Sequence, residues 1–374
     1  MVEVSACVRP GQTRARLEHV SKRFAAAERS LRGTKLEAKG PILWARNLMR
    51  AVRLTKADMA PVQALADVCL TLAAGEVFGL IGPNGSGKTT LLKILAGLLR
   101  PTSGNGEVAG VPLTEPAAIR RRVSYVSTTG WMGLEWALTA EENVRFFATL
   151  SGLSGHKARE RTEEALRDTD LWEDRGKRTS ELSNGMRQRL ILARGLVLRT
   201  PLVLLDEPTV CLDPVTRDEV LDRIFTNLPA RGQTVLVADH QVGAVSSRMD
   251  HAAILSGGSV VAIGTPSALV QGLRNLKVLE LMVAGAEALP QPPLACVRAW
   301  DARMRPGPLA LAQVRLMVED RPDSLRSVLD YVMRQGGQIE GVTERPPGLE
   351  DLLETGALDG PPAGSIGPGN RSTS

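Results

Sequence analysis

Short apolar runs alternate with stretches of helical spacing along most of this chain. Three runs are continuously apolar, which is typical of strands that are buried on both faces of a parallel sheet. They are Val77–Ile81, Leu202–Leu205 and Thr234–Ala238. Apolar residues at helical spacing predict helices over 140–150, 157–168 and 185–198. Strands that alternate with helices in this way predict an α/β fold with a parallel sheet.

Weaker strand signals lie on either side of these runs. Alternating apolar and polar residues predict strands over Arg16–Phe24 and Ala64–Leu72, with shorter ones over Val108–Val111 and Val123–Val126. A Gly257-Gly258 turn between two apolar segments, 252–255 and 260–263, predicts a β-hairpin. Further along, the pattern predicts strands over 277–283 and 309–318 and a helix over 324–334, which is a small α+β appendage.

Glycine and proline punctuation suggests how the chain is divided. We expect a loose leader over 1–14, a main domain over 15–265, the appendage over 266–356 and a disordered tail over 357–374. Within the main domain, we expect an insertion over 25–60 and a helical subdomain over about 130–195.

Bulk composition narrows the class of protein. The chain has 374 residues, a formal net charge of +5 and a pI of about 9.2. Its four cysteines are far apart in sequence, so neither a metal site nor a disulfide framework is expected, and a reducing cytosol fits. No apolar run approaches the roughly 20 residues that span a bilayer, and no secretory signal begins the chain. A membrane function would therefore need spans from another polypeptide.

The insertion over 25–60 is rich in cations and poor in acids. Its cations include Arg29, Arg32, Lys35, Lys39, Arg46, Arg50, Arg53 and Lys56. Apolar residues at roughly helical spacing accompany them, so the segment could lie against membrane headgroups or a partner's cytoplasmic face. A solvated surface excursion is an equally good interpretation.

One segment matches the phosphate-binding pattern G-x-x-x-x-G-K-[ST], with a predicted strand before it and a predicted helix, Leu91–Leu99, after it. Its residues are Gly82, Pro83, Asn84, Gly85, Ser86, Gly87, Lys88, Thr89 and Thr90. Such a turn points backbone N–H groups at a phosphate, and the helix N-terminus adds positive charge. We expect Lys88 to reach the outer phosphates and the Thr89 hydroxyl to bind Mg²⁺.

Acidic residues and a histidine follow the other two buried strands. Asp206 and Glu207 come directly after Leu202–Leu205, and His240 comes shortly after Thr234–Ala238. Because ligands of parallel α/β sheets bind at the carboxyl ends of the strands, we expect these residues to gather beside the phosphate loop. The alternative for the two carboxylates is an ordinary helix N-cap pair.

A further segment, Leu182-Ser183-Asn184-Gly185-Met186-Arg187-Gln188-Arg189, precedes the Asp206 strand and resembles the L-S-G-G-Q signature of ATP-binding cassette (ABC) ATPases, from which Asn184 and Met186 depart. Leu202–Leu205 with Asp206-Glu207-Pro208-Thr209 resembles the Walker B strand and catalytic carboxylate of that family. Cys211-Leu212-Asp213 is similar to its D-loop, and His240 occupies its switch-histidine position. The resemblance covers residues 16–265 and implies a P-loop NTPase fold with an ABC helical subdomain.

The resemblance implies an ATPase that uses ATP and Mg²⁺. Phosphoryl transfer needs charge neutralisation and a positioned nucleophile. Lys88, with a Mg²⁺ held by Thr89 and, through water, by Asp206, would supply the first requirement. Glu207 would polarise the attacking water as general base, and His240 would sense the γ-phosphate.

The signature residues Ser183, Asn184, Gly185 and Met186 are expected to act in trans. In this family two cassettes stack head to tail, so the signature helix of one faces the nucleotide held by the other. A plain N-cap by Ser183 or Asn184 is the alternative, and it is compatible with that role. Since the chain holds one cassette, we expect a homodimer or a heterodimer of cassettes, with Asp213 in the D-loop.

Two positions depart from the simplest family pattern. Phe24 is a candidate adenine-stacking residue, although a buried core phenylalanine is an equally good interpretation. The glutamine that normally contacts Mg²⁺ is missing, because the sequence has none between Gln63 and Gln188. Its position falls near Ser127 or Thr128, and either hydroxyl or Glu135 could substitute; we assign Thr128. Hydrolysis is then expected to be slow or differently coupled.

Residues 139–147 resemble the L-T-x-x-E-N-x-x-F-F stretch of exporter-type cassettes, and 347–353 resemble the P-S-L-E-D-V-F tail of the same group. This implies separate membrane permease subunits, whose coupling helix would meet Trp131 and Trp136, and a peripheral location on the cytoplasmic face of the membrane. Local packing is the alternative for both tryptophans. One alternative is an ABC ATPase that acts on ribosomes or nucleic acid, but such proteins usually have two cassettes in one chain and this chain has one. Another alternative is a regulatory cassette that hydrolyses ATP slowly.

Overall fold

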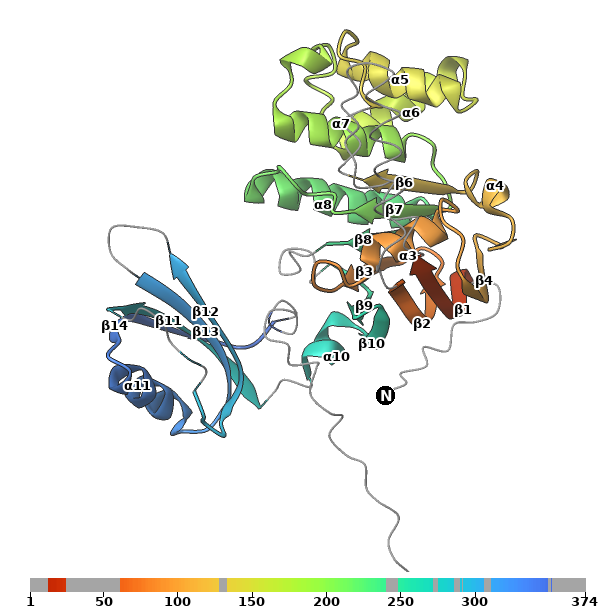
Figure 1. Cartoon of the computed structure of the whole chain (residues 1–374). Helices are drawn as coiled ribbons and strands as arrows, with labels where there is room; N and C mark the ends of the chain where they lie inside the picture. Colours follow the sequence, from red (N-terminus) through yellow and green to blue (C-terminus); the bar gives the residue numbers. More distant parts are fainter. Residues whose placement is uncertain are drawn as a thin grey trace, which may run out of the picture. The chain divides into compact units, whose positions relative to one another are not determined.

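Figure 1 shows the computed structural model of the chain. It describes residues 13–24, 61–127, 133–239, 248–271, 275–285, 290, 292–305, 311–348 and 351. The predictions for the basic insertion, Thr128, Trp131, His240 and the tail after 356 lie outside these residues. Thr13 and Arg14 belong to the first strand, so the predicted leader boundary after residue 14 is wrong by two positions.

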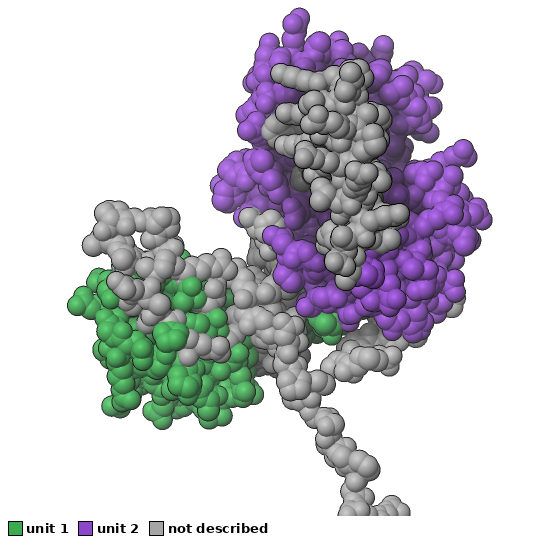
Figure 2. Space-filling view, viewed as in Figure 1, with its two compact units in different colours: residues 1–4, 241–247, 261–374 green, residues 5–240, 248–260 purple. Residues whose placement is uncertain are grey.

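The described residues form two compact units (Figure 2). The larger holds those up to Asp239 together with 248–260, and the smaller holds those from Val261 onward. The division therefore falls inside a strand rather than after residue 265, where the sequence pattern places it.

A six-stranded sheet forms the core of the larger unit, in the order β10-β9-β3-β8-β7-β6. The strands are β6 (Val123–Ser127), β7 (Leu202–Asp206), β8 (Thr234–Ala238), β3 (Val77–Ile81), β9 (His251–Ser256) and β10 (Ser259–Gly264). The first five are parallel. Every residue of β3, β7 and β8 is buried, which explains why these strands are apolar without alternation. The predicted parallel α/β fold is confirmed.

A second, antiparallel sheet has the order β2-β1-β4-β5. It consists of β1 (Thr13–Phe24), β2 (Val62–Ala73), β4 (Ser103–Val108) and β5 (Val111–Pro112). The strand predicted over Val108–Val111 is wrong, because Ala109 and Gly110 form the turn between β4 and β5, both at positive φ. Phe24 at the end of β1 pairs with Val62 at the start of β2.

The larger unit also contains several helices. They are α3 (Lys88–Leu95), α4 (Pro116–Ile119), α5 (Ala140–Leu150), α6 (Gly155–Asp168), α7 (Asn184–Leu196) and α8 (Pro214–Ala230), with a 3₁₀ turn η2 (Thr179–Glu181). In Figure 1, α5, α6 and α7 pack together as a helical layer. The helix predicted over Leu91–Leu99 ends earlier, because Gly97 takes a positive φ directly after its C-cap. None of the described helices is long and apolar enough to cross a membrane.

The smaller unit is an antiparallel sheet in the order β12-β13-β11-β14, with one helix packed on it. Its elements are α10 (Pro266–Gln271), β11 (Leu276–Ala284), β12 (Val297–Arg305), β13 (Leu311–Glu319), α11 (Ser324–Arg334) and β14 (Gln338–Arg345). Val328 and Val332 of α11 pack against the buried side chains of β11 and β13. The expected small α+β fold of this part is found, with two strands that the sequence pattern did not indicate.

Candidate active site

The phosphate loop joins β3 to α3 and carries glycines where a side chain would collide with neighbouring backbone. A Cβ at Gly82 would lie 2.2 Å from the carbonyl oxygen of Leu255, and one at Gly87 would lie 2.5 Å from that of Ala64. Gly87 also has a φ of +109°, which disfavours other residues. Because this glycine is the N-cap of α3, no side chain caps the first turn of the helix, whose N–H groups suit an anion.

Lys88 is the first residue of α3 and is 6% exposed. Its Nζ donates to the carbonyl oxygens of Gly82 (2.6 Å) and Pro83 (3.0 Å), so the ammonium lies across its own loop. Burial lowers the pKa of Lys88, and three nearby carboxylates oppose that shift, those of Glu207, Asp206 and Asp239. The cation is thus held beside the phosphate loop among acidic groups.

Asp206 ends β7 and is 4% exposed. Its Oδ1 accepts a hydrogen bond from the Thr89 hydroxyl at 3.1 Å, and its Oδ2 accepts one from the Tyr125 hydroxyl at 2.8 Å. A hydroxyl and a carboxylate oxygen are the kind of hard ligands that Mg²⁺ prefers. The structure thus brings Thr89 and Asp206, the two residues that were assigned to Mg²⁺, into contact, whereas the contact of Tyr125 with Asp206 was not predicted.

Glu207 follows β7 in an unusual backbone conformation. Its φ is +50°, which few non-glycine residues adopt, and its N–H donates to the Ala238 carbonyl oxygen at 2.8 Å. Backbone strain of this kind persists where the surroundings hold it and is concentrated at functional sites. Glu207 is therefore placed at the carboxyl edge of the sheet, as predicted, and not as part of a helix N-cap.

A cavity of about 360 Å³ opens over the phosphate loop. It is lined by Phe24, Val62, Gln63, Ala64, Asn84, Gly85, Gly87, Lys88, Thr89, Thr90 and Glu207. Phe24 is thus brought to the same cavity as the phosphate loop, with the Lys22 ammonium 5.0 Å from its ring centroid. Val62, Gln63 and Ala64 were not predicted to line the cavity; the pairing of Phe24 with Val62 brings this strand beside it.

The residues at this cavity fit a magnesium nucleotide. Ser86 Oγ is buried yet has no hydrogen-bond partner among the described residues, as expected for a donor that serves a ligand. The N-terminus of α3 and Lys88 suit the phosphates, Thr89 and Asp206 suit the metal ion, and Phe24 offers a ring for a base. When bound, the metal ion would supply charge neutralisation at the phosphates.

The signature residues lie elsewhere. None of Ser183, Asn184, Gly185 and Met186 lines the cavity over the phosphate loop. Ser183 is the N-cap of α7 and accepts from the Met186 N–H at 3.2 Å, so the predicted cap is confirmed. Ser183 and Asn184 are exposed, which leaves this helix end accessible.

Two contacts explain how the ends of neighbouring elements are held. Gln188 of α7 is buried and donates to the Pro208 carbonyl oxygen at 3.2 Å, which links the signature helix to the segment after β7. Asp213, predicted as a D-loop residue, is the N-cap of α8 and accepts from the Thr216 N–H at 3.1 Å. Hydrogen bonding to Thr216, first through its side chain and then through its backbone N–H, lowers the pKa of Asp213.

The segment that begins at Gly133 is fixed by the motif over 139–147. Thr139 and Glu142 form a capping box at the start of α5. The buried Asn143 side chain accepts from the Glu135 N–H at 2.9 Å and donates to the Thr179 hydroxyl at 2.8 Å. Glu135 is therefore anchored by its backbone. Trp136 remains 48% exposed.

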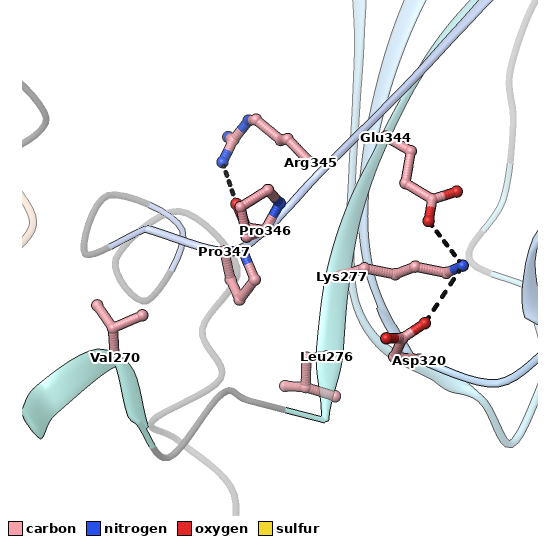
Figure 3. A pocket seen from close by; sticks show the side chains of 8 residues that line it. All are labelled: Val270, Leu276, Lys277, Asp320, Glu344, Arg345, Pro346 and Pro347. Carbon is pink, nitrogen blue, oxygen red and sulfur yellow. Dashed lines mark hydrogen bonds and ion pairs between the residues drawn. The ribbon is translucent and has the colours of Figure 1, made fainter. Parts of the chain in front are cut away.

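A larger cavity, of about 450 Å³, lies in the smaller unit (Figure 3). It is lined by Val270, Leu276, Lys277, Asp320, Glu344, Arg345, Pro346 and Pro347. Its charges pair with one another or with neighbours: Lys277 Nζ lies 2.9 Å from Glu344 Oε1 and 3.5 Å from Asp320 Oδ1. It has no counterpart of the phosphate loop, so the smaller cavity is the candidate active site.

A phosphate loop after β3, a carboxylate pair at the end of β7 and an aromatic residue at the cavity define a P-loop nucleoside triphosphatase. The family described as "ABC transporter" matches residues 65–210. The chain is 32% identical over 295 residues to the daunorubicin resistance ATP-binding protein DrrA2 of Streptomyces coeruleorubidus, covering 78% of this chain and 89% of that protein. It belongs to the ATP-binding cassette transporter family, as an ATP-binding subunit.

Other relatives agree. The Nod factor export ATP-binding protein I of Rhizobium sp. (strain N33) is 31% identical, over 76% of this chain and 88% of that protein. Among solved structures, the dimeric post-hydrolysis state of the ATP-binding cassette MJ0796 bound to ADP and Pi has a TM-score of 0.53 and 25% identity, over 67% of this chain and 98% of that one. The chain is thus an ABC ATPase of the exporter-type group, which binds and hydrolyses ATP.

Proposed function

We propose that this chain drives export by closing a dimer of cassettes on ATP and passing that movement to separate permease subunits. The observation that carries the proposal is the separation of the phosphate loop from the signature residues. The first lies at the cavity with Glu207, and the second lies at an exposed helix end outside it. A complete site then needs the signature helix of a second cassette, from a copy of this chain or from a sister subunit.

Within each site the residues have distinct roles. Lys88 and the N-terminus of α3 would hold the phosphates, while Thr89 would hold Mg²⁺ directly and Asp206 would hold it through water. Glu207 acts as general base for the attacking water. His240, which lies outside the described residues, reports the γ-phosphate. From the partner cassette, the signature N-terminus adds positive potential, and the Ser183 cap leaves other N–H groups free for this role.

The permease would dock on the helical layer beside Trp136. Apolar side chains are exposed just before α5 and along that helix, with Trp136 at 48%, Phe146 at 50% and Leu150 at 70%. Trp136 is also held by the Arg187 guanidinium, 4.8 Å from its ring centroid, which joins this surface to the signature helix α7. Exposed aromatic residues of this kind suit a groove for a partner helix. Trp131 belongs to the same proposal from sequence alone.

A peripheral location on the cytoplasmic face of the membrane follows from this assignment. The basic insertion over 25–60 would contact anionic headgroups there. The expected measurement is cosedimentation of the purified chain with vesicles that contain anionic lipid and not with neutral vesicles. Binding that is indifferent to lipid charge would contradict this role. The ribosome and nucleic-acid alternative gains no support from the relatives, which are named for export or drug resistance.

The central test uses a variant that binds ATP without hydrolysing it. Glu207→Gln should lower turnover about 10²- to 10⁴-fold, because the general base is lost. The same variant should form a stable dimer with MgATP, measured by light scattering, while Lys88→Ala should stay monomeric as the matched control. Adding Ser183→Arg to Glu207→Gln should abolish the dimer without weakening nucleotide binding to the monomer. A Glu207→Gln chain that remains monomeric at saturating MgATP, alone and with its coexpressed permease and any sister cassette, would refute the proposal.

A further inference from the structure

Tyr125 is a tyrosine of β6 whose side chain reaches the neighbouring strand. Its hydroxyl lies 2.8 Å from Asp206 Oδ2, although the two residues are 81 positions apart in sequence. Parallel pairing of β6 with β7 sets Ser127 opposite Asp206 and Tyr125 opposite Leu204. The tyrosine ring therefore spans the two-residue offset and brings its hydroxyl to the carboxylate.

Asp206 is held from two directions. Thr89, on α3 directly after the phosphate loop, donates to Oδ1, and Tyr125, on the sheet, donates to Oδ2. With one hydroxyl on each oxygen, the plane of this buried carboxylate is fixed. Each oxygen still has a free lone pair, so the carboxylate can also accept from water bound to a metal ion.

The phenol is a donor in this contact. Burial raises the pKa of Tyr125, and the charge of Asp206 and the hydrogen bond to it raise it further. The phenol O–H therefore donates this hydrogen bond to Asp206 Oδ2. A hydrogen bond between a neutral donor and a carboxylate is among the stronger ones in proteins.

We propose that Tyr125 is a positioning residue for the Mg²⁺ of the bound nucleotide, acting through Asp206 by fixing the orientation of its carboxylate. This inference rests on the proposed role of Asp206 at the metal ion. Outer-shell partners that orient the groups around a metal ion typically change metal affinity about 10- to 100-fold when removed. The role has added weight here because the sequence has no glutamine between Gln63 and Gln188 to orient the ion from that side of the site.

The variant Tyr125→Phe removes the hydroxyl and keeps the ring. We expect the Mg²⁺ concentration at half-saturation of binding to rise about 10-fold or more, measured with a fluorescent, non-hydrolysable ATP analogue. Binding of the same analogue in EDTA should stay unchanged. The chain has only two tyrosines, so Tyr331→Phe is a matched control: its hydroxyl donates to the Pro290 carbonyl oxygen in the other unit.

A second measurement leaves the protein intact. Incorporation of 3-fluorotyrosine gives two ¹⁹F resonances, which Tyr331→Phe assigns. The non-hydrolysable analogue is added first in EDTA and then with Mg²⁺. We expect the Tyr125 resonance to shift on addition of Mg²⁺, because the carboxylate that it contacts then faces the ion, while the Tyr331 resonance stays in place.

The outcomes separate this inference from the proposed function. The inference would be wrong if Tyr125→Phe kept the Mg²⁺ dependence of the wild-type chain, or if the Tyr125 resonance did not shift on addition of Mg²⁺. The hydrogen bond would then only satisfy a buried carboxylate. If the wild-type chain bound the analogue with no Mg²⁺ dependence at all, the role of Asp206 would fall as well. A Mg²⁺-specific loss in Tyr125→Phe alone would support both.

Discussion

Replacement of Phe24 by alanine tests whether its ring stacks on the adenine base. The ring lines the cavity over the phosphate loop, and the Lys22 ammonium lies 5.0 Å from its centroid. Stacking of a base on an aromatic side chain contributes about 1–3 kcal/mol. Because Lys22 occupies one face of the ring, we expect the lower part of this range, about 1–2 kcal/mol. That is a rise of about 5- to 30-fold in the Kd for ATP.

The assay compares ATP with inorganic tripolyphosphate, each with Mg²⁺, by isothermal titration calorimetry. Tripolyphosphate has the phosphate chain without the base, so its affinity should be the same for the wild-type chain and Phe24→Ala. Phe24→Trp, which keeps an aromatic face, should retain ATP affinity. An equal loss for both ligands would show that Phe24 only shapes the cavity, and unchanged ATP binding would refute stacking.

Three further predictions concern turnover, stability and pH. Thr128→Ala should change ATP turnover in a reconstituted complex with little effect on ATP binding, and unchanged turnover would count against Thr128 as the glutamine substitute. Asp168→Ala should destabilise the larger unit by about 3 kcal/mol in urea denaturation, because the buried carboxylate accepts from Arg231 at 2.5 and 3.2 Å; a loss below about 1 kcal/mol would contradict this. Burial raises the pKa of Glu76 above its ordinary 4.5. The Glu76 carboxyl therefore contributes most to the stability of the folded state below pH 4.5, and this contribution is lost as pH rises through its pKa in the folded protein. As pH rises through this range, the free energy of unfolding of Glu76→Gln should increase relative to that of the wild type. A difference in the free energy of unfolding that does not change with pH would refute the reasoning.

The buried centre of the larger unit could be predicted from sequence, whereas the edge strands of the smaller sheet could not. β3, β7 and β8 are buried on both faces, so burial alone makes their residues apolar. By contrast, β12 and β14 are the two edge strands of the smaller sheet and have many polar residues. An edge strand is paired on one side only and needs no continuous apolar run, which is why both were missed. α8 was missed despite helical apolar spacing and a proline in its first turn.

The same limit applies to the site. The phosphate loop and the carboxylates at the end of β7 are each contiguous in sequence, so their spacing alone was enough to predict them. Tyr125 meets Asp206 only through the register of two parallel strands, and Val62 meets the cavity only because it pairs with Phe24. Register is set by the packing of the whole sheet and is not visible in either strand by itself. The unusual φ of Glu207 is likewise a property of the assembled edge.

The pairing of Phe24 with Val62 also has a practical consequence for protein engineering. Residues directly opposite each other in an antiparallel pair have Cα atoms about 4.5–5.5 Å apart, a gap that a hairpin turn of roughly two to five residues can bridge. Residues 25–60 could therefore be exchanged for such a turn, or for a compact reporter domain whose termini are close together, with both strands left in register. A fluorophore placed there would be attached at the rim of the nucleotide cavity and could act as a built-in optical sensor of ATP occupancy.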